Sequence, residues 1–335
     1  MWKIAIDIGS SMTKIYRADT GSGIVLAEPS CVAVSGESNE VKAVGKEAKS
    51  LIGKTAELTN IIYPVYEGEV VHLELASAML KEFFARIGVK PSTLRRSQVL
   101  IGVPCGIRKE ALEQYALLAE ECGLKRAVFV EQPYLQAVGA GARLSEADSA
   151  FCIDIGGGIT NIAVLSADGI IAGASMNIGG NNIDETIRWR VERANGLRIG
   201  ALTAERLKME IGSLLQNARG AFVAEGSSVD TLRPASSSVQ TSEIRDCIRV
   251  YVDKIIEYAG DVLRTLPAEV SANVHRNGVF LSGGMMKLPG LPQYIGAKLE
   301  MRYHLCEEPQ FATVLGGGAV VQDKVLLAQL GKETE

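Results

Sequence analysis

Residues 150–165 place a carboxylate two residues before a run of three glycines, a combination that can bind a charged ligand. Residues 151–153 are typical of a buried strand that ends at Asp154, and residues 162–165 are typical of a second strand. The glycines between them let the backbone approach an anion closely and point N–H groups at it. An aspartate in this place favours a phosphate only through a divalent cation. The stretch therefore predicts a metal and phosphate site, while a plain glycine-rich hairpin explains it equally well by itself.

The same pattern occurs a second time, near the N-terminus. Residues 6–16 and 153–163 share six identical positions, and each copy has an apolar strand on both sides of its turn. Solenoid repeats have much shorter periods, so two distant copies indicate a duplicated domain. Two such turns facing each other across a cleft could hold one metal-bound nucleotide from both sides. The identical pairs are Ile6 and Ile153, Asp7 and Asp154, Ile8 and Ile155, Gly9 and Gly156, Thr13 and Thr160, and Ile15 and Ile162.

The residues after the glycines distinguish this pattern from the commoner phosphate loops. A Rossmann loop or a P-loop runs into a helix, whereas here the chain continues as a strand and Asp168-Gly169 predicts a hairpin turn. The sequence contains neither Gly-x-Gly-x-x-Gly after a strand nor Gly-x-x-x-x-Gly-Lys-Ser/Thr. A third glycine turn, Gly283-Gly284, follows an expected strand at 278–282 and precedes an expected helix at 287–299. It could lie against a nucleoside.

With these three turns, the chain resembles the actin, chaperone and sugar-kinase ATPase superfamily, and within it the bacterial actins of the MreB family. The resemblance implies an α/β, actin-like ATPase fold with two duplicated domains around a nucleotide cleft, each a mixed sheet with a β-meander and helices, and each with a small subdomain. The first domain would comprise residues 1–135 and 311–335, with its small subdomain at about 28–68, and residues 311–330 would return as a helix. The second would comprise 136–310, with its small subdomain at about 218–241. The stretches that carry the resemblance are residues 23–30, 43–48, 101–107, 131–133, 139–141, 203–213 and 315–318.

Composition narrows the class of protein. The chain has 335 residues, 47% of them hydrophobic and 22% charged, which is an ordinary soluble globular composition with room for two domains. The net charge of −4 gives no reason to expect nucleic acid as a partner. No apolar run approaches the roughly 20 residues that span a bilayer, and we expect no signal peptide because the first strand begins at once. Six cysteines without metal-ligand spacing fit a reducing cytosol, so a cytoplasmic location is predicted.

The resemblance assigns roles to the two repeated turns. Asp7 and Asp154 would hold a magnesium ion, mainly through its water shell, because that ion loses its waters reluctantly. The backbone around them would wrap the β- and γ-phosphates of ATP. Thr13 and Thr160 either start their strands, where β-branched residues are favoured, or contact a phosphate, and Thr160 is a catalytic candidate on the second interpretation. The phosphate-binding candidates are Gly9, Ser10, Ser11 and Met12 in the first turn and Gly156, Gly157, Gly158 and Ile159 in the second.

Residues 131–133, Glu-Gln-Pro, matter most for the chemistry. The MreB pattern has two glutamates before this proline, and the second would orient or deprotonate the attacking water. Here that position is Gln132, whose amide can position a water but cannot accept its proton. Actin itself has a glutamine at this place, so hydrolysis is not excluded. Glu131 could be the base only if the helix start were rotated, and its other interpretation is a pair with its surroundings or with the water shell of the metal.

A second departure from the family pattern lies at Ile159. The family usually has a threonine directly after the three glycines, and its hydroxyl helps to hold the attacking water. Loss of a general base typically costs about 10²–10⁴ in rate, and loss of the hydroxyl should add to this. We therefore predict that ATP hydrolysis is slow or impaired while nucleotide binding is retained.

Further candidates would face the nucleoside and the start of the next helix. Glu205 and Lys208 are three residues apart on one helix face, where they form either a solvated ion pair or contacts to the ribose and adenine. The family often has a third glycine where Met285 stands, so this side chain would narrow the adenine site or pack beside it. In the turn before the helix at 182–195, either Asn181 or Asn182 could be the cap. The remaining candidates are Gly179, Gly180, Asn181, Gly283, Gly284 and Met285.

The resemblance also implies self-association into filaments and a part in determining cell shape. It adds the inner membrane surface and membrane-bound cell-wall synthesis proteins as further partners. In the loop 91–96, Leu94 could enter a bilayer while Arg95 and Arg96 meet anionic head groups, or the loop could be a solvated basic surface. The alternative function is a chaperone-like or scaffold ATPase of the same superfamily that does not polymerise. A small-molecule kinase ranks third, since we find no acceptor-site signature, and the sequence does not distinguish ATP from GTP.

Overall fold

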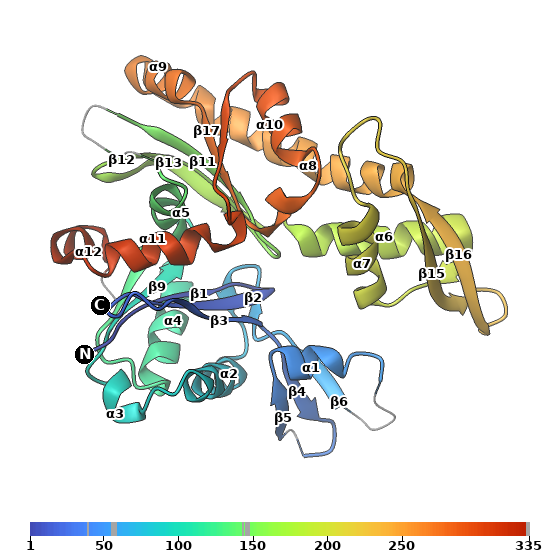
Figure 1. Cartoon of the computed structure of the whole chain (residues 1–335), viewed down its shortest axis with the longest axis horizontal. Coiled ribbons are helices and arrows are strands. Elements are labelled where there is room, and N and C mark those ends of the chain that lie inside the picture. The colour runs from blue at the N-terminus through green and yellow to red at the C-terminus, as the bar shows by residue number, and fades with distance from the viewer. Residues whose placement is uncertain (39, 55–58, 143, 145–147, 333–335) are drawn as a thin grey trace.

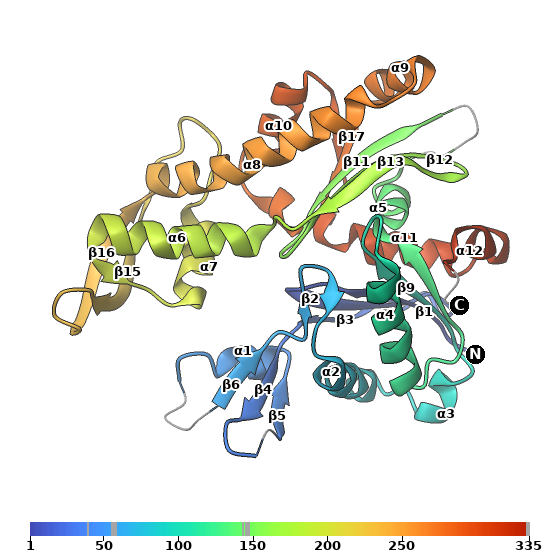
Figure 2. The same ribbon diagram turned by 180° about the vertical axis from the view of Figure 1, so that it is seen from behind.

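A computed structural model describes residues 1–332 apart from 39, 55–58, 143 and 145–147. The chain forms two large domains that face each other, each extended by a smaller unit, and both termini lie on the first domain (Figure 1). Figure 2 shows the same arrangement from behind. The last residues of the expected first domain, 333–335, lie outside the described part of the chain.

The first large domain is built on a mixed five-stranded sheet in the order β10-β9-β1-β2-β3. Strand β1 pairs antiparallel with β2 and parallel with β9. Its alternating isoleucines, such as Ile4 and Ile6, are buried under α2 (Leu73–Arg86) and α4 (Lys109–Glu121) on one face of the sheet. On the other face α5 (Gln132–Gly139) and α11 (Ala312–Val320) pack on residues such as Leu100. The strands are β1 (Lys3–Ile8), β2 (Met12–Arg17), β3 (Gly23–Pro29), β9 (Gln98–Val103) and β10 (Ala127–Glu131).

The second large domain repeats this topology. Its sheet has the order β13-β12-β11-β17-β18, so β11 takes the central place that β1 has in the first sheet. The repeat extends to the register, because Asp7 lies opposite Lys14 and Asp154 lies opposite Asn161. The elements are β11 (Ala150–Ile155), β12 (Thr160–Ser166), β13 (Gly169–Met176), β17 (Val279–Ser282), β18 (Tyr303–Leu305), α6 (Gly180–Asn195), α7 (Ala201–Ile211), α8 (Thr241–Arg264), α9 (Ala268–Asn277) and α10 (Leu291–Leu299).

Two small sheets extend the domains on the same side of the molecule (Figure 1). The first has the order β5-β4-β6 and carries the short helix α1. The second has the order β14-β15-β16, and its paired strands include the serine-rich stretches 226–228 and 236–238. Their elements, with the remaining short ones, are β4 (Val32–Ser35), β5 (Val41–Val44), α1 (Lys46–Ser50), β6 (Thr59–Ile62), β7 (Val65–Tyr66), β8 (Glu69–Val70), α3 (Pro91–Leu94), β14 (Leu197–Arg198), β15 (Ala221–Ser228), β16 (Pro234–Gln240), η1 (Gly284–Lys287), η2 (Pro309–Phe311) and α12 (Lys324–Leu330).

Helices α5 and α11 cross between the two large domains (Figure 1). A Cβ atom on Gly316 would overlap the carbonyl oxygen of Leu135, and one on Gly139 would overlap that of Ala312. The two backbones therefore touch at this crossing, and only glycine fits at either place. The expectation of one helix over 311–330 is wrong, because helix α11 ends at Val320 and a separate helix, α12, begins at Lys324.

Leu94 is 4% exposed, in the short helix α3. The interpretation in which this side chain enters a bilayer is therefore wrong, because it already packs in the core of the first domain. Arg95 and Arg96 are exposed. Among the described residues, no single helix is long and apolar enough to cross a membrane. The helical segments 309–320 and 324–330 together have the length and composition for it, but they are bent by 115° relative to each other. All six cysteines are free thiols.

Candidate functional site

The central strands β1 and β11 end at the cleft between the domains, and this places Asp7 and Asp154 in one cavity of about 460 Å³. Most of the residues proposed from the sequence line the same cavity. They are Asp7, Gly9, Ser10, Ser11, Met12, Gln132, Asp154, Gly156, Gly157, Gly158, Ile159, Gly180, Asn181, Glu205, Lys208, Gly283, Gly284 and Met285. Glu131, Thr160 and Gly179 do not line it.

The two repeated turns touch each other across this cavity. Ser11 Oγ donates a hydrogen bond to Asn181 Oδ1 over 3.0 Å. A Cβ atom on Gly157 would overlap the side chain of Ser11, and one on Gly158 would lie 2.7 Å from Ser10 Cβ. The glycines of the second turn are therefore needed for the serines of the first to approach, besides any close approach to a ligand.

Lys14 was missed by the sequence reasoning, although it lies at the centre of the site. Its Nζ donates to Asp7 Oδ2 over 2.7 Å, and its side chain is 15% exposed. Lys14 reaches Asp7 because β1 and β2 pair these two residues directly. The position opposite Asp154 in the second copy is Asn161, so the two halves differ here: one supplies a cation and the other a neutral amide.

Gln132 and Asn161 form a buried hydrogen-bonded chain that joins the two domains. Gln132 Nε2 donates to Asp7 Oδ1 over 3.1 Å, and Gln132 Oε1 accepts from Asn161 Nδ2 over 2.9 Å. Asn161 Oδ1 accepts from the backbone N–H of Cys105 over 3.2 Å and from the hydroxyl of Ser175. Both ends of the Gln132 amide are thus engaged by protein groups.

Asp154 is the carboxylate best suited to a cation. Burial, with a smaller contribution from the nearby Asp7, raises its pKa to about 7 against the attraction of Lys14. Two buried carboxylates with one ammonium leave an excess of negative charge, and carboxylate oxygens are the ligands that magnesium prefers. Gln136 Oε1, in a side chain 2% exposed that lines the same cavity, has no hydrogen-bond partner in the described structure. The donor set therefore fits a hydrated divalent cation.

Three of the proposed residues have structural partners instead. Glu131 Oε1 accepts from the backbone N–H of Gly106 over 2.6 Å, and Lys332 pairs with its other oxygen at 3.4 Å. Thr160 Oγ1 donates to Ile178 O over 2.7 Å and is fully buried. Gly179 N donates to Asn182 Oδ1 over 2.7 Å, so Gly179 is the N-cap residue of α6, the side chain of Asn182 satisfies its N–H, and Asn181 faces the cavity. As catalytic candidates, Glu131 and Thr160 have no geometric support.

Glu205 and Lys208 do not pair with each other. Lys208 Nζ donates to Asp184 Oδ2 over 2.7 Å and to Gly180 O over 2.9 Å, while Glu205 pairs with Lys49 of the other domain. Burial raises the pKa of Asp184 to about 6 against the opposing attraction of Lys208. Asp184 Oδ1 has no hydrogen-bond partner in the described structure and, like Lys208, lines the cavity. Met285 is 7% exposed and lies beside Gly180 in the cavity wall.

The family model described as MreB/Mbl protein matches residues 1–329. This chain belongs to the MreB/Mbl family. It is 32% identical to the cell shape-determining protein Mbl of Bacillus subtilis (strain 168), with 96% of each chain covered. It is 31% identical to the cell shape-determining protein MreB of Escherichia coli (strain K12), with 95% of this chain and 93% of that protein covered. The resemblance found in the sequence is thereby confirmed.

Solved structures agree with this assignment to the MreB/Mbl family. The crystal structure of MreB5 of Spiroplasma citri bound to AMPPNP has a TM-score of 0.88 to this chain, with 26% identity and 93% of each chain covered. The MamK double helical filament has a TM-score of 0.79, with 96% of this chain and 98% of that chain covered. At 20% identity, the second likeness shows the fold alone. The expected actin-like α/β fold is confirmed.

Proposed function

We propose that this protein binds ATP with Mg²⁺ between its two domains and assembles into actin-like filaments that take part in determining cell shape. The observation that carries the proposal is the meeting of the two repeated Asp-Gly turns in one cavity. The structures of MreB5 bound to AMPPNP and to ADP, each with a TM-score of 0.88, support a nucleotide in a fold of this kind. The cell-shape relatives and the MamK filament support the role and the assembly.

The charges of the cavity suit a metal-bound triphosphate. Asp154 and Asp7 would hold the magnesium ion through its waters, and the ion would neutralise the phosphate oxygens. The N–H groups of the second turn would bind the phosphates, as glycine-rich turns do. Lys14 adds a positive charge beside them. The nucleoside would then lie between Glu205 and the turn at Gly283.

We propose further that hydrolysis is slow. The Gln132 amide is held in place by Asp7 and Asn161, so it can contact a water only with its remaining N–H or lone pair, and it cannot accept a proton. Ile159 offers no hydrogen bond, and a Cβ atom on Gly68, at the tip of the β7–β8 hairpin, would lie 3.2 Å from its Cδ1. At the position where the family has a threonine hydroxyl to hold the attacking water, this protein therefore presents the apolar side chain of Ile159.

Single-turnover phosphate release tests this part of the proposal. The wild type should retain ATP and release phosphate slowly, and Gln132→Glu combined with Ile159→Thr should accelerate release by about 10²-fold or more, the usual contribution of a general base. Ile159→Val, which keeps this side chain apolar, is the matched control and should leave the rate unchanged. Equal rates for the wild type and the double variant would refute the assignment of both residues.

Electron microscopy of the purified protein with ATP, with ADP and without nucleotide tests the assembly. Filaments are expected, whereas monomers under all conditions at high concentration would favour the non-polymerising ATPase. We place the filaments in the cytoplasm at the inner face of the membrane, with cell-wall synthesis proteins as partners and with the exposed Arg95 and Arg96 toward anionic lipids. Pelleting with anionic vesicles should fall on Arg95→Glu with Arg96→Glu, and equal pelleting of both proteins would exclude this surface.

A further inference from the structure

Within the described residues, an ion pair between α1 of the first small unit and α7 of the second large domain bridges the mouth of the cleft. Lys49 on α1 places its Nζ 2.7 Å from Glu205 Oε2 and 2.9 Å from Glu205 Oε1 on α7. Figures 1 and 2 both show α1 and α7 facing each other across the opening. Glu205 lines the cavity, so the pair lies beside the nucleotide position and not on a remote surface. The two side chains are 31% and 34% exposed, so water reaches the pair even while it is formed.

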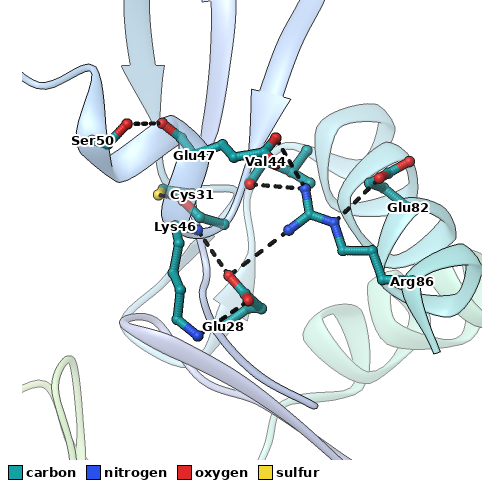
Figure 3. A network of polar contacts seen from close by, with 9 residues as sticks. Glu28, Cys31, Val44, Lys46, Glu47, Ser50, Glu82 and Arg86 are labelled. Carbon is teal, nitrogen blue, oxygen red and sulfur yellow. Dashed lines mark hydrogen bonds and ion pairs between the residues drawn. The ribbon is translucent and has the colours of Figure 1, made fainter. Parts of the chain in front are cut away.

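Helix α1 is fixed from the first large domain, so Lys49 is held in place. Figure 3 shows the network that does this. Glu28, at the end of β3, accepts the backbone N–H of Lys46 over 2.8 Å at the start of α1. Arg86 of α2 donates to Val44 O over 3.4 Å and to Glu47 over 3.3 Å. Because α1 has only five residues and its N-cap is a glycine, these external groups set its direction.

Helix α7 is fixed to the floor of the cleft in the same way. One turn beyond Glu205, Lys208 pairs with Asp184 and with the carbonyl of Gly180, at the start of α6 beside the second glycine turn. The pair at the mouth is therefore connected through rigid elements to the residues proposed to hold the phosphates. Glu205 and Lys208 of α7 line the cavity, and the pair with Lys49 ties α1 to this wall, so α1 and α7 can separate only if the pair breaks.

We infer that the Lys49–Glu205 pair is a latch that closes the cleft over the nucleotide and slows its release. The inference rests on the proposed nucleotide binding and adds to it a residue, Lys49, that does not line the cavity itself. An ion pair of this exposure contributes modestly, so its loss should accelerate release by about two- to fivefold. Higher ionic strength should accelerate release from the wild type toward the rate of the variant, because salt screens exposed pairs.

Displacement of a fluorescent ADP analogue by excess ATP, followed by stopped flow, measures this rate. Lys49→Met should release the analogue about two- to fivefold faster. Lys46→Met is the matched control: it lies on the same helix, is 72% exposed and pairs with Glu28 within its own domain, so its rate should equal that of the wild type. In a Glu205→Gln background, Lys49→Met should cause no further acceleration, because the pair is already broken.

Two results would overturn the latch while nucleotide binding stands. One is that the Lys49→Met variant releases the analogue as slowly as the wild type. The other is that Lys49→Met accelerates release by the same factor whether or not Glu205→Gln is present. If the wild type retains no labelled nucleotide at all, the proposed function fails and the latch fails with it. Equilibrium binding of the analogue to the wild type separates this last outcome from the first two.

Discussion

Asn161 gives the sharpest test of how the two domains are joined. Its amide donates to Gln132 Oε1 over 2.9 Å and accepts from the backbone N–H of Cys105 over 3.2 Å. Asn161→Ala leaves both partners without this bond in a buried place, since Cys105 is 4% and Gln132 6% exposed. An unsatisfied buried polar group costs about 1–3 kcal/mol, so with two such groups the free energy of unfolding should fall by about 2–6 kcal/mol.

Urea denaturation of the ligand-free protein measures this loss. Asn177→Ala is the matched control, because Asn177 also bridges the domains, with Glu67 over 2.8 Å, but is exposed. Its substitution should change the free energy of unfolding by no more than about 0.5 kcal/mol. Asn161→Asp should also destabilise the protein, because a carboxylate cannot donate to Gln132 Oε1 and adds a buried negative charge opposite Asp154. If Asn161→Ala costs no more than Asn177→Ala, the buried chain of amides does not join the domains as described.

Three other substitutions test separate parts of the structure. Gly316→Ala should destabilise the protein by about 1–3 kcal/mol or more in urea denaturation, since the added methyl meets Leu135 O, whereas Gly284→Ala meets no atom and should not. Lys14→Met should weaken ATP about tenfold or more in a fluorescence titration, because one charge-assisted contact is lost, and unchanged affinity would remove Lys14 from the site. Burial raises the pKa of the Asp184 carboxyl from its ordinary value of 3.8 to about 6. Between these two values the folded protein binds more protons than the unfolded chain, so the free energy of unfolding falls as pH rises from about 4 to 6. Asp184→Asn should flatten that slope, and an unchanged slope would contradict the raised pKa.

The duplicated turns could be predicted because their signal is local. An Asp-x-Gly pattern at the end of an apolar strand fixes where the carboxylate stands, and a second copy places its partner. Lys14 and Asn161 could not be found in this way, since each looks like an ordinary strand residue. Their importance comes from the antiparallel register, which sets Lys14 against Asp7 and Asn161 against Asp154. Alignment of the two strands in each copy would have offered that signal.

The errors have a different origin. The loop around Leu94 was interpreted as open, but Pro91 starts a short helix that turns this side chain into the core. Three glycines in a row at 316–318 lower helix propensity, yet they lie inside α11, because a Cβ atom would meet the backbone of α5 at Gly316, Ala5 at Gly317 and the Tyr16 ring at Gly318. Glu131 was a candidate by its neighbourhood in sequence, and its backbone partner Gly106 comes from a different loop. In each case tertiary packing decided what short-range patterns could not.

The crossing of α5 and α11 limits how the two halves can move. Where two backbones touch without side chains between them, pulling the helices apart loses dense contact at once. Turning one helix over the other about the point where Gly139 and Gly316 meet keeps that contact. The structure therefore favours rotation of the two domains about this helix crossing over their direct separation. Under the proposed function, a nucleotide bound near this crossing would set the angle between the two domains, and a neighbouring subunit in a filament would contact the domains at that angle.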